Sequence, residues 1–309
     1  MSGTAPAVGA AEVRVVVVTY SPGPALDTFL DTLDGATTRT CTVVLADNGS
    51  DDGSVERAAG RPGVTLLPTG RNLGYGGAAN VGARGGSEPW LVVANPDIAW
   101  RAGALDELLA ATARWPDAAA FGPAILTPAG ELYPSARGFP SLSRGTGHAV
   151  LGWWWPSNPW TRSYRRESGP PAEGRTGWLS GSCLLLRRSA FDAVGGFDPA
   201  YFMYFEDLDL CRRLAQAGCP SVYVPAAVVT HTGGHATSRK RRRMLRAHHV
   251  SAYRYLAADH PGAARAPLRA LLALGLAVRY ALSLVVPGMG EGARPTRSGS
   301  VLGGADEAG

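Results

Sequence analysis

The stretch Leu91-Val92-Val93-Ala94-Asn95-Pro96-Asp97-Ile98 decides the fold prediction, because a short apolar run stops there at an amide, a proline and a carboxylate. The apolar run is typical of a parallel strand that is covered on both faces. Pro96 can neither donate to a strand ladder nor let Asn95 continue as helix. Asp97 is therefore expected just beyond the carboxyl end of a buried strand, where open α/β sheets bind ligands. The alternative is an Asx-type turn that caps the following helix.

Apolar runs of this kind recur along the chain and alternate with helical patterns. Strands are expected at Arg14–Thr19, Thr42–Ala46 and Val64–Leu67, and helices at Leu26–Leu33, Ala78–Ala83 and Leu105–Ala113. This alternation, with polar residues collected after the strands, predicts a parallel, Rossmann-like sheet that binds a nucleotide. No G-x-G-x-x-G follows Thr19 directly and no G-x-x-x-x-G-K-[ST] occurs in the chain. A dehydrogenase or a P-loop NTPase is therefore not expected.

The composition is that of an ordinary globular protein, since 45% of the 309 residues are hydrophobic and 18% are charged. Residues 1–11 and 288–309 are rich in small residues and are expected to be disordered. The four cysteines form no C-x-x-C pair, and the first eleven residues lack the basic and apolar regions of a signal peptide. Free thiols in a reducing cytoplasm are the expectation.

Basic residues are concentrated in one place. The net charge is only +5, yet six basic side chains fall between Arg239 and Arg246. Such a run is a solvated helix face or a contact for nucleic acid or anionic lipid. Nucleic acid is not expected as a partner, because the run has no interleaved aromatic residues that would form a stacking surface.

The pattern weakens after Phe121-Gly122-Pro123. Residues 131–176 contain many prolines and arginines, which indicates a long loop rather than regular structure. Four tryptophans in this loop are expected to form a mobile flap or an acceptor wall, with a core role as the alternative. They are Trp153, Trp154, Trp155 and Trp160. Gly177–Leu186 then returns to a strand pattern.

A pair of carboxylates, Glu206 and Asp207, precedes apolar residues that recur at helical spacing. Both are therefore expected in the first turn of a helix. The ordinary explanation is that a helix dipole favours negative charge at its N-terminus. Short strands are expected at Val222–Val224 and Val228–Thr230. A lone histidine after a strand is usually unremarkable, but the Thr-His-Thr-Gly-Gly loop leaves the His231 imidazole free to meet a metal.

The carboxyl-terminal region is both basic and apolar. Leu245, Ala252 and Leu256 are expected to share one helix face, with the arginine cluster pointing away from it. Leu268–Val286 approaches the length of a membrane span, but arginines at 269 and 279 interrupt it. This pattern favours a helix that lies on or in the membrane interface over one that spans the bilayer. A core helix of the soluble domain is the remaining alternative.

With these pieces in order, the chain resembles the family 2 glycosyltransferases of the GT-A fold over about Val13–Val250, and within them the bacterial cell-wall rhamnosyltransferases. Its motifs in chain order are Val18-Thr19-Tyr20, Leu45-Ala46-Asp47-Asn48-Gly49-Ser50, Asn72-Leu73-Gly74, Asn95-Pro96-Asp97, Trp178-Leu179-Ser180-Gly181, Phe205-Glu206-Asp207-Leu208-Asp209 and His231. The fold that this resemblance implies is α/β: a Rossmann-like, mostly parallel sheet flanked by helices, with a C-terminal helical, membrane-associating appendage.

The resemblance also implies a binding site for a nucleotide-sugar donor. A diphosphate leaving group needs a divalent cation, Mg²⁺ or Mn²⁺, with Asp97 as a direct ligand and His231 as a second one. Asn95 stands where many relatives have the first aspartate of a D-x-D motif, which suggests a sugar or ribose contact instead. Asp47 is expected to read the pyrimidine base. The other implied donor contacts are Thr19, Tyr20, Asn48, Arg71 and Asn72, and the implied acceptor contacts are Trp178, Ser180 and Gly181.

The reaction that the resemblance implies is an inverting transfer of L-rhamnose from dTDP-rhamnose to a polyprenyl-diphosphate-linked saccharide, in cell-wall or polysaccharide synthesis. Asp207, beside Glu206 in the catalytic pair, is expected to accept the proton of the acceptor hydroxyl in a single displacement. One alternative is a UDP-sugar transferase with another acceptor. Another is a non-catalytic nucleotide-binding module, which would have no need of a base.

The expected organisation is a disordered N-terminus (1–11), a GT-A domain (12–235), a basic and apolar helical region (236–287) and a disordered tail (288–309). A cytoplasmic protein, peripheral on the inner face of the plasma membrane, follows from the arginine cluster and the apolar helix. An anionic membrane surface and a possible second copy of the chain are the expected partners besides the substrates.

Overall fold

The computed structural model describes residues 12–140, 172–232 and 241–285. The termini for which disorder is expected, the four clustered tryptophans and the start of the arginine cluster lie outside these described residues.

The first half of the chain forms the expected parallel sheet, in the order β3-β2-β1-β4. Its strands are β1 (Val13–Thr19), β2 (Cys41–Asp47), β3 (Val64–Pro68) and β4 (Trp90–Ala94). Thr19 and Asp47 are register partners at the carboxyl ends of β1 and β2. The prediction that polar loops meet at one edge of a parallel sheet is therefore confirmed for these strands.

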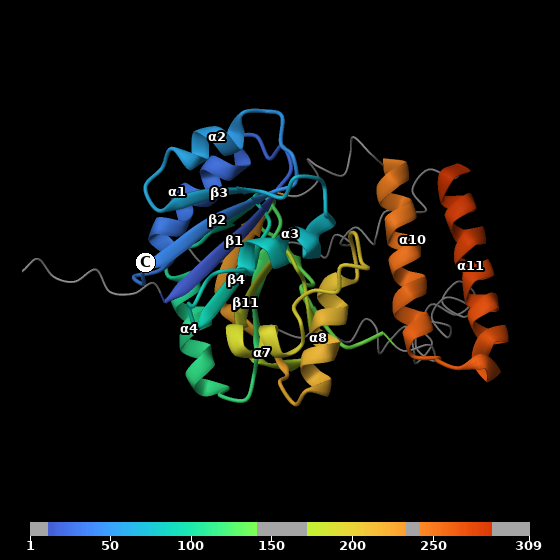
Figure 1. Cartoon of the computed structure of the whole chain (residues 1–309). Coiled ribbons are helices and arrows are strands. Elements are labelled where there is room, and N and C mark those ends of the chain that lie inside the picture. Colours follow the sequence, from blue (N-terminus) through green and yellow to red (C-terminus); the bar gives the residue numbers. More distant parts are fainter. Residues whose placement is uncertain (1–11, 141–171, 233–240, 286–309) are drawn as a thin grey trace, which may run out of the picture.

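Helices cover both faces of this sheet (Figure 1). They are α1 (Ala25–Ala36), α2 (Ser54–Ala59), α3 (Gly74–Ala83), α4 (Ala104–Arg114), α7 (Arg188–Ala193) and α8 (Glu206–Gln216). Side chains on β1 alternate between the two faces: Val15 and Val17 pack with α1, α2 and α4, whereas Val16 and Val18 pack with α3 and α8. This double burial explains why the strands are continuous apolar runs rather than alternating ones.

The second half of the sheet is mixed, because β11 (Cys183–Arg187) runs antiparallel between β4 and β6 (Ala120–Leu126). The strand β6 was not expected, since Gly122 and Pro123 resemble strand breakers. Its ladder with β11 uses only Ala120 and Phe121, so the missing amide of Pro123 removes no bond from that ladder. A side chain at position 122 would clash with Leu179, because a Cβ there would lie 2.8 Å from a Leu179 methyl.

The described parts of residues 131–176 contain short strands rather than loop alone. These are β7 (Leu132–Tyr133), β8 (Ala136–Arg137) and β9 (Gly174–Thr176), and β8 pairs with β10 (Trp178–Leu179). The two short strands expected at 222–230 form one strand, β12 (Ser221–His231), with an irregularity between Val224 and Val228. Its far edge pairs with β5 (Ile98–Trp100).

The C-terminal region is a helical hairpin that stands beyond α8 in Figure 1. It consists of α10 (Arg241–Ala258), a 3-10 turn (Ala263–Arg265) and α11 (Ala266–Val285). Ala263–Val285 is long and apolar enough to cross a membrane by length and composition. Its outer face is exposed, with Leu271 at 66% and Val285 at 79%, so the alternative of a core helix is wrong. The expected outward direction of the arginine cluster is also wrong for Arg243, which lies over the Phe202 ring at 4.8 Å.

Candidate active site

The loop after β2 is held in place by the Asp47 carboxylate. Asp47 accepts hydrogen bonds from the Thr19 hydroxyl at 2.8 Å and from the Gly49 and Ser50 backbone amides at 3.1 and 3.0 Å. The Ser50 hydroxyl donates to it as well. Thr19 is fully buried and Asp47 nearly so. These two predicted donor contacts therefore lie together, and their present partners belong to the loop itself.

Asn48 connects this loop to the one after β3. Its amide donates to the Gly74 carbonyl at 3.1 Å, and its carbonyl accepts the Leu73 amide at 2.9 Å. Asn72, another predicted donor contact, accepts the Gly74 amide through its own side chain at 3.0 Å. The predicted donor residues thus converge from the carboxyl ends of three adjacent strands. Of this set, Arg71 is exposed and Tyr20 partly exposed.

Asp97 and His231 meet because of strand pairing. β5 runs antiparallel to β12 and sets Ile98 opposite His231, so the residue before Ile98 lies beside the histidine. The Asp97 Oδ1 atom lies 3.0 Å from His231 Nε2, and the Asn95 side-chain amide lies 3.2 Å from the same nitrogen. The Asp97 backbone carbonyl also accepts the Thr232 amide at 3.1 Å. The Asx-turn alternative for Asp97 is therefore unnecessary.

The Asp97 and His231 side chains fit a cation that is shared with a ligand. A carboxylate oxygen and an imidazole nitrogen about 3 Å apart match two neighbouring ligands of one octahedral ion. Within the described residues, no group of three or more His, Cys, Asp or Glu side chains is arranged to hold a metal. Protein atoms alone therefore give such an ion too few ligands, and diphosphate oxygens are the natural complement.

Asp207 is presented by a strained turn. Tyr204 and Phe205 both have positive φ angles, of 66° and 68°, and Phe205 is the N-cap of α8. Aromatic residues rarely adopt this conformation, which accumulates at functional sites. The Asp207 carboxylate accepts the amides of Gly181 and Leu208, each at 2.8 Å. A backbone loop from another strand therefore orients it, in addition to its own helix.

The two neighbouring carboxyl groups have different environments. Burial raises the pKa of Glu206 well above its ordinary value, and the charge of Asp207 raises it further. The Glu206 Oε2 atom is buried and has no hydrogen-bond partner. Burial also raises the pKa of Asp207, but the Gly181 and Leu208 amides oppose that shift. Burial therefore raises the pKa of both carboxyl groups, and the Gly181 and Leu208 amides favour the ionised form of Asp207.

Asp209, the third carboxylate of this turn, is already neutralised. It pairs with Arg212 at 3.1 Å and with Arg213 at 2.7 Å, and its side chain is only 6% exposed. Both of its carboxylate oxygens are therefore occupied by guanidinium groups. The geometry therefore favours Asp207 over Asp209 as the base.

One of the predicted acceptor residues, Gly181, lies directly against Asp207. Gly181 contacts it so closely that a Cβ at position 181 would lie 3.1 Å from the Asp207 Cβ. The Ser180 amide donates to the Ser135 carbonyl at 2.8 Å, and Trp178 is partly buried against the core. The sequence reasoning missed Tyr75, whose hydroxyl donates to the Gly181 carbonyl. Its place in a glycine-rich helix start gave no signal of this contact.

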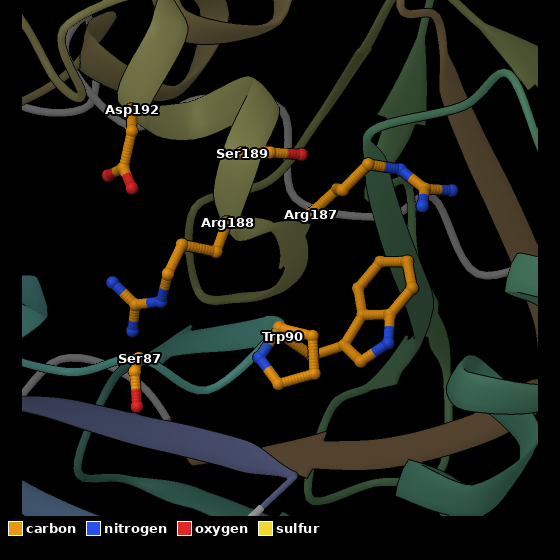
Figure 2. Close-up of a pocket in the computed structure, with 7 residues that line it drawn as sticks. Ser87, Trp90, Arg187, Arg188, Ser189 and Asp192 are labelled. Atoms are coloured by element: carbon orange, nitrogen blue, oxygen red, sulfur yellow. The ribbon is translucent and has the colours of Figure 1, made fainter.

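A surface hollow at the other end of the sheet is not part of this site. Figure 2 shows Arg188 extending toward Ser87 and Arg187 beside the Trp90 ring. Trp90 begins β4, whereas the predicted site follows its carboxyl end. Both arginines donate to backbone carbonyls, and Arg188 also lies 3.5 Å from Glu88. Their donors are committed to the fold rather than to a ligand.

The fold and the residues at the carboxyl ends of its strands point to a glycosyltransferase. The family model "Glycosyltransferase like family 2" matches residues 10–249, and the chain belongs to that family. It is 56% identical over 277 residues to the N-acetylglucosaminyl-diphospho-decaprenol L-rhamnosyltransferase of Mycobacterium tuberculosis, which covers 86% of this chain and 90% of that protein. A rhamnosyltransferase of Escherichia coli is 46% identical over 80 residues, or 26% of this chain and 30% of that protein. The predicted family is therefore confirmed.

Solved structures agree on the fold. A mannosyltransferase from Pyrobaculum calidifontis in complex with GDP-Man and Mn²⁺ superposes with a TM-score of 0.53 and 19% identity, covering 91% of this chain and 77% of that one. GalNAc-T7 with UDP, GalNAc and Mn²⁺ also gives 0.53, at 15% identity, covering 72% of this chain and 43% of that one. The predicted α/β architecture of the GT-A type is confirmed.

Proposed function

We propose that this protein transfers L-rhamnose from dTDP-rhamnose to an N-acetylglucosaminyl-diphospho-polyprenol in cell-wall synthesis. The observation that carries the proposal is the 56% identity to a mycobacterial enzyme named for that acceptor and that sugar, over nearly the whole of both chains. Asp97 and His231 lie in contact, and Asp207 is held by the backbone amide of Gly181. The presence of all three supports sugar transfer, because nucleotide binding alone needs no base.

The donor is proposed to bind over the carboxyl ends of β1, β2 and β4. Asp47 and Asn48 shape this surface through their bonds to Thr19 and Gly74. Tyr20 and Arg71 are more exposed, so these two side chains are proposed to contact the nucleotide directly. The atom of Asn95 that faces His231 is its side-chain nitrogen, at 3.2 Å, and this nitrogen carries no lone pair for a metal. Asn95 is therefore proposed to contact the sugar or ribose.

A divalent cation, Mn²⁺ or Mg²⁺, is proposed to be held by Asp97 and His231. When bound, such an ion supplies Lewis-acid stabilisation of the departing nucleoside diphosphate. An imidazole ligand favours Mn²⁺ over Mg²⁺, since Mg²⁺ prefers oxygen. The solved relatives that contain Mn²⁺ support the same choice.

Asp207 is proposed to act as the general base of a single displacement. Its carboxylate takes the proton of the acceptor hydroxyl as that oxygen bonds to the anomeric carbon, while the bond from this carbon to the diphosphate oxygen breaks. The anomeric configuration is therefore inverted. Burial raises the pKa of Asp207 toward the working pH, which is the direction that improves a base.

The hairpin of α10 and α11 is proposed to dock on the cytoplasmic face of the membrane, where a lipid-linked acceptor lies. Residues 241–285 contain eight arginines and one aspartate, a charge that suits an anionic surface. The outer face of α11 is an exposed apolar stripe that consists of Leu271, Leu274, Val278, Leu282 and Val285. Its inner face packs on α10, with His249 and Tyr280 in ring contact at 5.5 Å. This contact favours a helix lying on the membrane over one that spans it.

The test is transfer by the purified protein in neutral detergent micelles that contain N-acetylglucosaminyl-diphospho-polyprenol. We expect product with dTDP-rhamnose and little with UDP-glucose, UDP-galactose or UDP-N-acetylglucosamine, and an inverted linkage by NMR. A preference for any UDP-sugar would overturn the donor assignment. Absence of transfer to the lipid-linked acceptor with every donor would overturn the acceptor assignment.

A further inference from the structure

A group of arginines on the first turns of α10 has no counter-charge. Arg242, Arg243 and Arg246 are exposed, and within the described part of the chain they contact no carboxylate. Residues 242 and 246 are four apart and 243 and 246 are three apart, so their side chains are neighbours on one helix face. Like charges at these spacings destabilise a helix. An anion bound to the cluster would relieve this repulsion.

The cluster is fixed to the segment that carries the base. The guanidinium of Arg243 lies 4.8 Å from the centre of the Phe202 ring, a cation–π contact. Phe202 precedes the catalytic pair by only four residues, and its carbonyl accepts the Tyr75 amide at 3.1 Å. The arginines therefore have a defined place beside the catalytic loop.

Further contacts hold α10 in that place. The Ser251 hydroxyl donates to the Met203 carbonyl at 2.9 Å. The His248 ring packs edge-on against Tyr204 and Phe205, each at 5.5 Å, and these are the two residues with strained backbone. One turn farther along, Tyr255 is buried against Phe205. Between Arg243 and Tyr255, α10 thus lies along the loop from 202 to 205.

α10 lies between α11, which exposes an apolar face, and α8, which carries Asp207 in its first turn (Figure 1). An acceptor with a lipid tail, an anionic bridge and a sugar hydroxyl has its parts in that order. We propose that Arg242, Arg243 and Arg246 form the subsite that binds the diphosphate of the lipid-linked acceptor. This inference rests on the proposed function for the identity of the acceptor.

The chemistry of the three groups fits this role. Arginine binds phosphate oxygens through paired N–H donors and stays charged at every working pH. A diphosphate offers more negative charge and more oxygens than a monophosphate, so three adjacent guanidinium groups discriminate between the two. Arg212, on α8, provides the contrast: it is paired with Asp209 and Asp259 and has no such capacity left.

The experiment uses full-length protein in neutral detergent micelles, where no anionic headgroup is present. With saturating dTDP-rhamnose, Arg243→Gln is expected to raise KM for N-acetylglucosaminyl-diphospho-polyprenol about tenfold or more, since bonds to charged groups are the strong ones. The KM for the donor and the kcat should stay unchanged, and the melting temperature should fall by no more than a few degrees, because only one cation–π contact of an exposed side chain is lost. The wild type should prefer this acceptor to its monophosphate analogue, and the variant should lose that preference. Arg279→Gln, which removes the same charge from α11, is the control and should behave as the wild type.

Two results would overturn the subsite. An unchanged acceptor KM in micelles, together with equal losses of binding to anionic vesicles in both variants, would assign the arginines to lipid headgroups. A raised donor KM would assign Arg243 to the donor site, and a fall in melting temperature beyond those few degrees would assign it to the fold.

Failure of the proposed function leaves the subsite testable. If the wild type transfers no sugar to the lipid-linked acceptor, the subsite can still be tested by binding. The measurement is the affinity of nucleotide-saturated protein for farnesyl diphosphate in neutral micelles. Loss of this binding in Arg243→Gln but not in Arg279→Gln supports the subsite. Equal binding by both variants and the wild type refutes it.

Discussion

Replacing Asp207 by asparagine separates its two possible roles, capping α8 and accepting a proton. The carboxylate accepts the Gly181 and Leu208 amides, one on each oxygen. An asparagine side chain has a single acceptor oxygen, so one of these amides would face an NH₂ group instead. An unsatisfied buried donor costs about 1–3 kcal/mol. We therefore expect the melting temperature to fall by several degrees, at about 2–4 °C per kcal/mol for a domain of this size.

A base role predicts a second and much larger effect. Without a proton acceptor, kcat should fall by about 10²–10⁴-fold at a temperature well below the melting transition, while KM for the donor stays unchanged. Steady-state assays with dTDP-rhamnose, combined with thermal melts of the same preparations, measure both quantities. The acid limb of the wild-type pH profile should also lie above 3.8, the ordinary pKa of an aspartate, because burial raises the pKa of Asp207.

Asp209→Asn is the matched control, since it removes one charge from the same helical turn. Asp209 pairs with Arg212 and Arg213 in a buried environment, so its loss should destabilise the fold by about 3–5 kcal/mol, more than the loss of Asp207. Its turnover at low temperature should nevertheless stay within about tenfold of the wild type, because it is not the base. If Asp207→Asn retains more than about a tenth of wild-type turnover, the assignment of the base is wrong.

Four further outcomes follow from the geometry. Glu206→Gln should become more stable than the wild type as the pH rises. Because the pKa of Glu206 is raised in the folded protein, its contribution to stability is present below about pH 4.5, its ordinary pKa, and is lost as the pH increases toward the raised value. Parallel curves of melting temperature against pH for the two proteins would contradict this. Tyr75→Phe removes the hydroxyl that donates to the Gly181 carbonyl. It should lower kcat about tenfold and leave the KM for the donor unchanged. A shift in the acid limb of the pH–rate profile would indicate that the orientation of Asp207 has changed. A change in melting temperature alone would reduce Tyr75 to a structural residue. Asp97→Ala should lose transfer and the stabilisation by Mn²⁺ plus nucleotide that thermal shift detects in the wild type, and full wild-type activity in excess EDTA would remove the cation from the proposal. A double variant on the exposed face of α11, Leu271→Ser with Leu274→Ser, should no longer sediment with anionic vesicles, at an unchanged melting temperature. The control Leu132→Ser changes an exposed leucine outside the hairpin and should sediment like the wild type. Equal sedimentation by the wild type, the double variant and the control would refute membrane docking by α11.

The parallel half of the fold was predictable because strands that are buried on both faces have apolar residues at consecutive positions. Val15 to Val18 and Leu91 to Ala94 are apolar at every position, which is what a covered parallel strand requires. The strand β6 was not predictable by the same rule. Gly122 is dictated by the approach of Leu179, a residue more than fifty positions away, and no local pattern records that contact.

The candidate site divides in the same way. Asp97 was expected at a strand end and His231 in a loop, and both expectations came from short local patterns. Their meeting depends on the pairing of β5 with β12, and β5 is only three residues long. A strand of that length carries too little periodicity to be read from the sequence.

The orientation of the base depends still more on distant contacts. No propensity predicts that Tyr204 and Phe205 adopt positive φ angles, since aromatic residues disfavour them. Such a conformation persists only where surrounding structure imposes it, and here the Met203 carbonyl is bonded to Ser251 while His248 packs on both rings. The expected domain boundary near residue 235 therefore separates two parts of the chain that both hold the turn before Asp207 in place.

The donor loops and the base also belong to one connected structure. Asn48 bonds to the carbonyl of Gly74, and the next residue, Tyr75, bonds through its amide to Phe202 and through its hydroxyl to Gly181. Gly181 in turn donates its amide to Asp207. A Cβ at position 74 would lie 1.9 Å from the Phe202 carbonyl oxygen, so only glycine permits this approach. The loop after β3 and the turn that carries Asp207 are therefore linked by a continuous chain of hydrogen bonds through Tyr75 and Gly181.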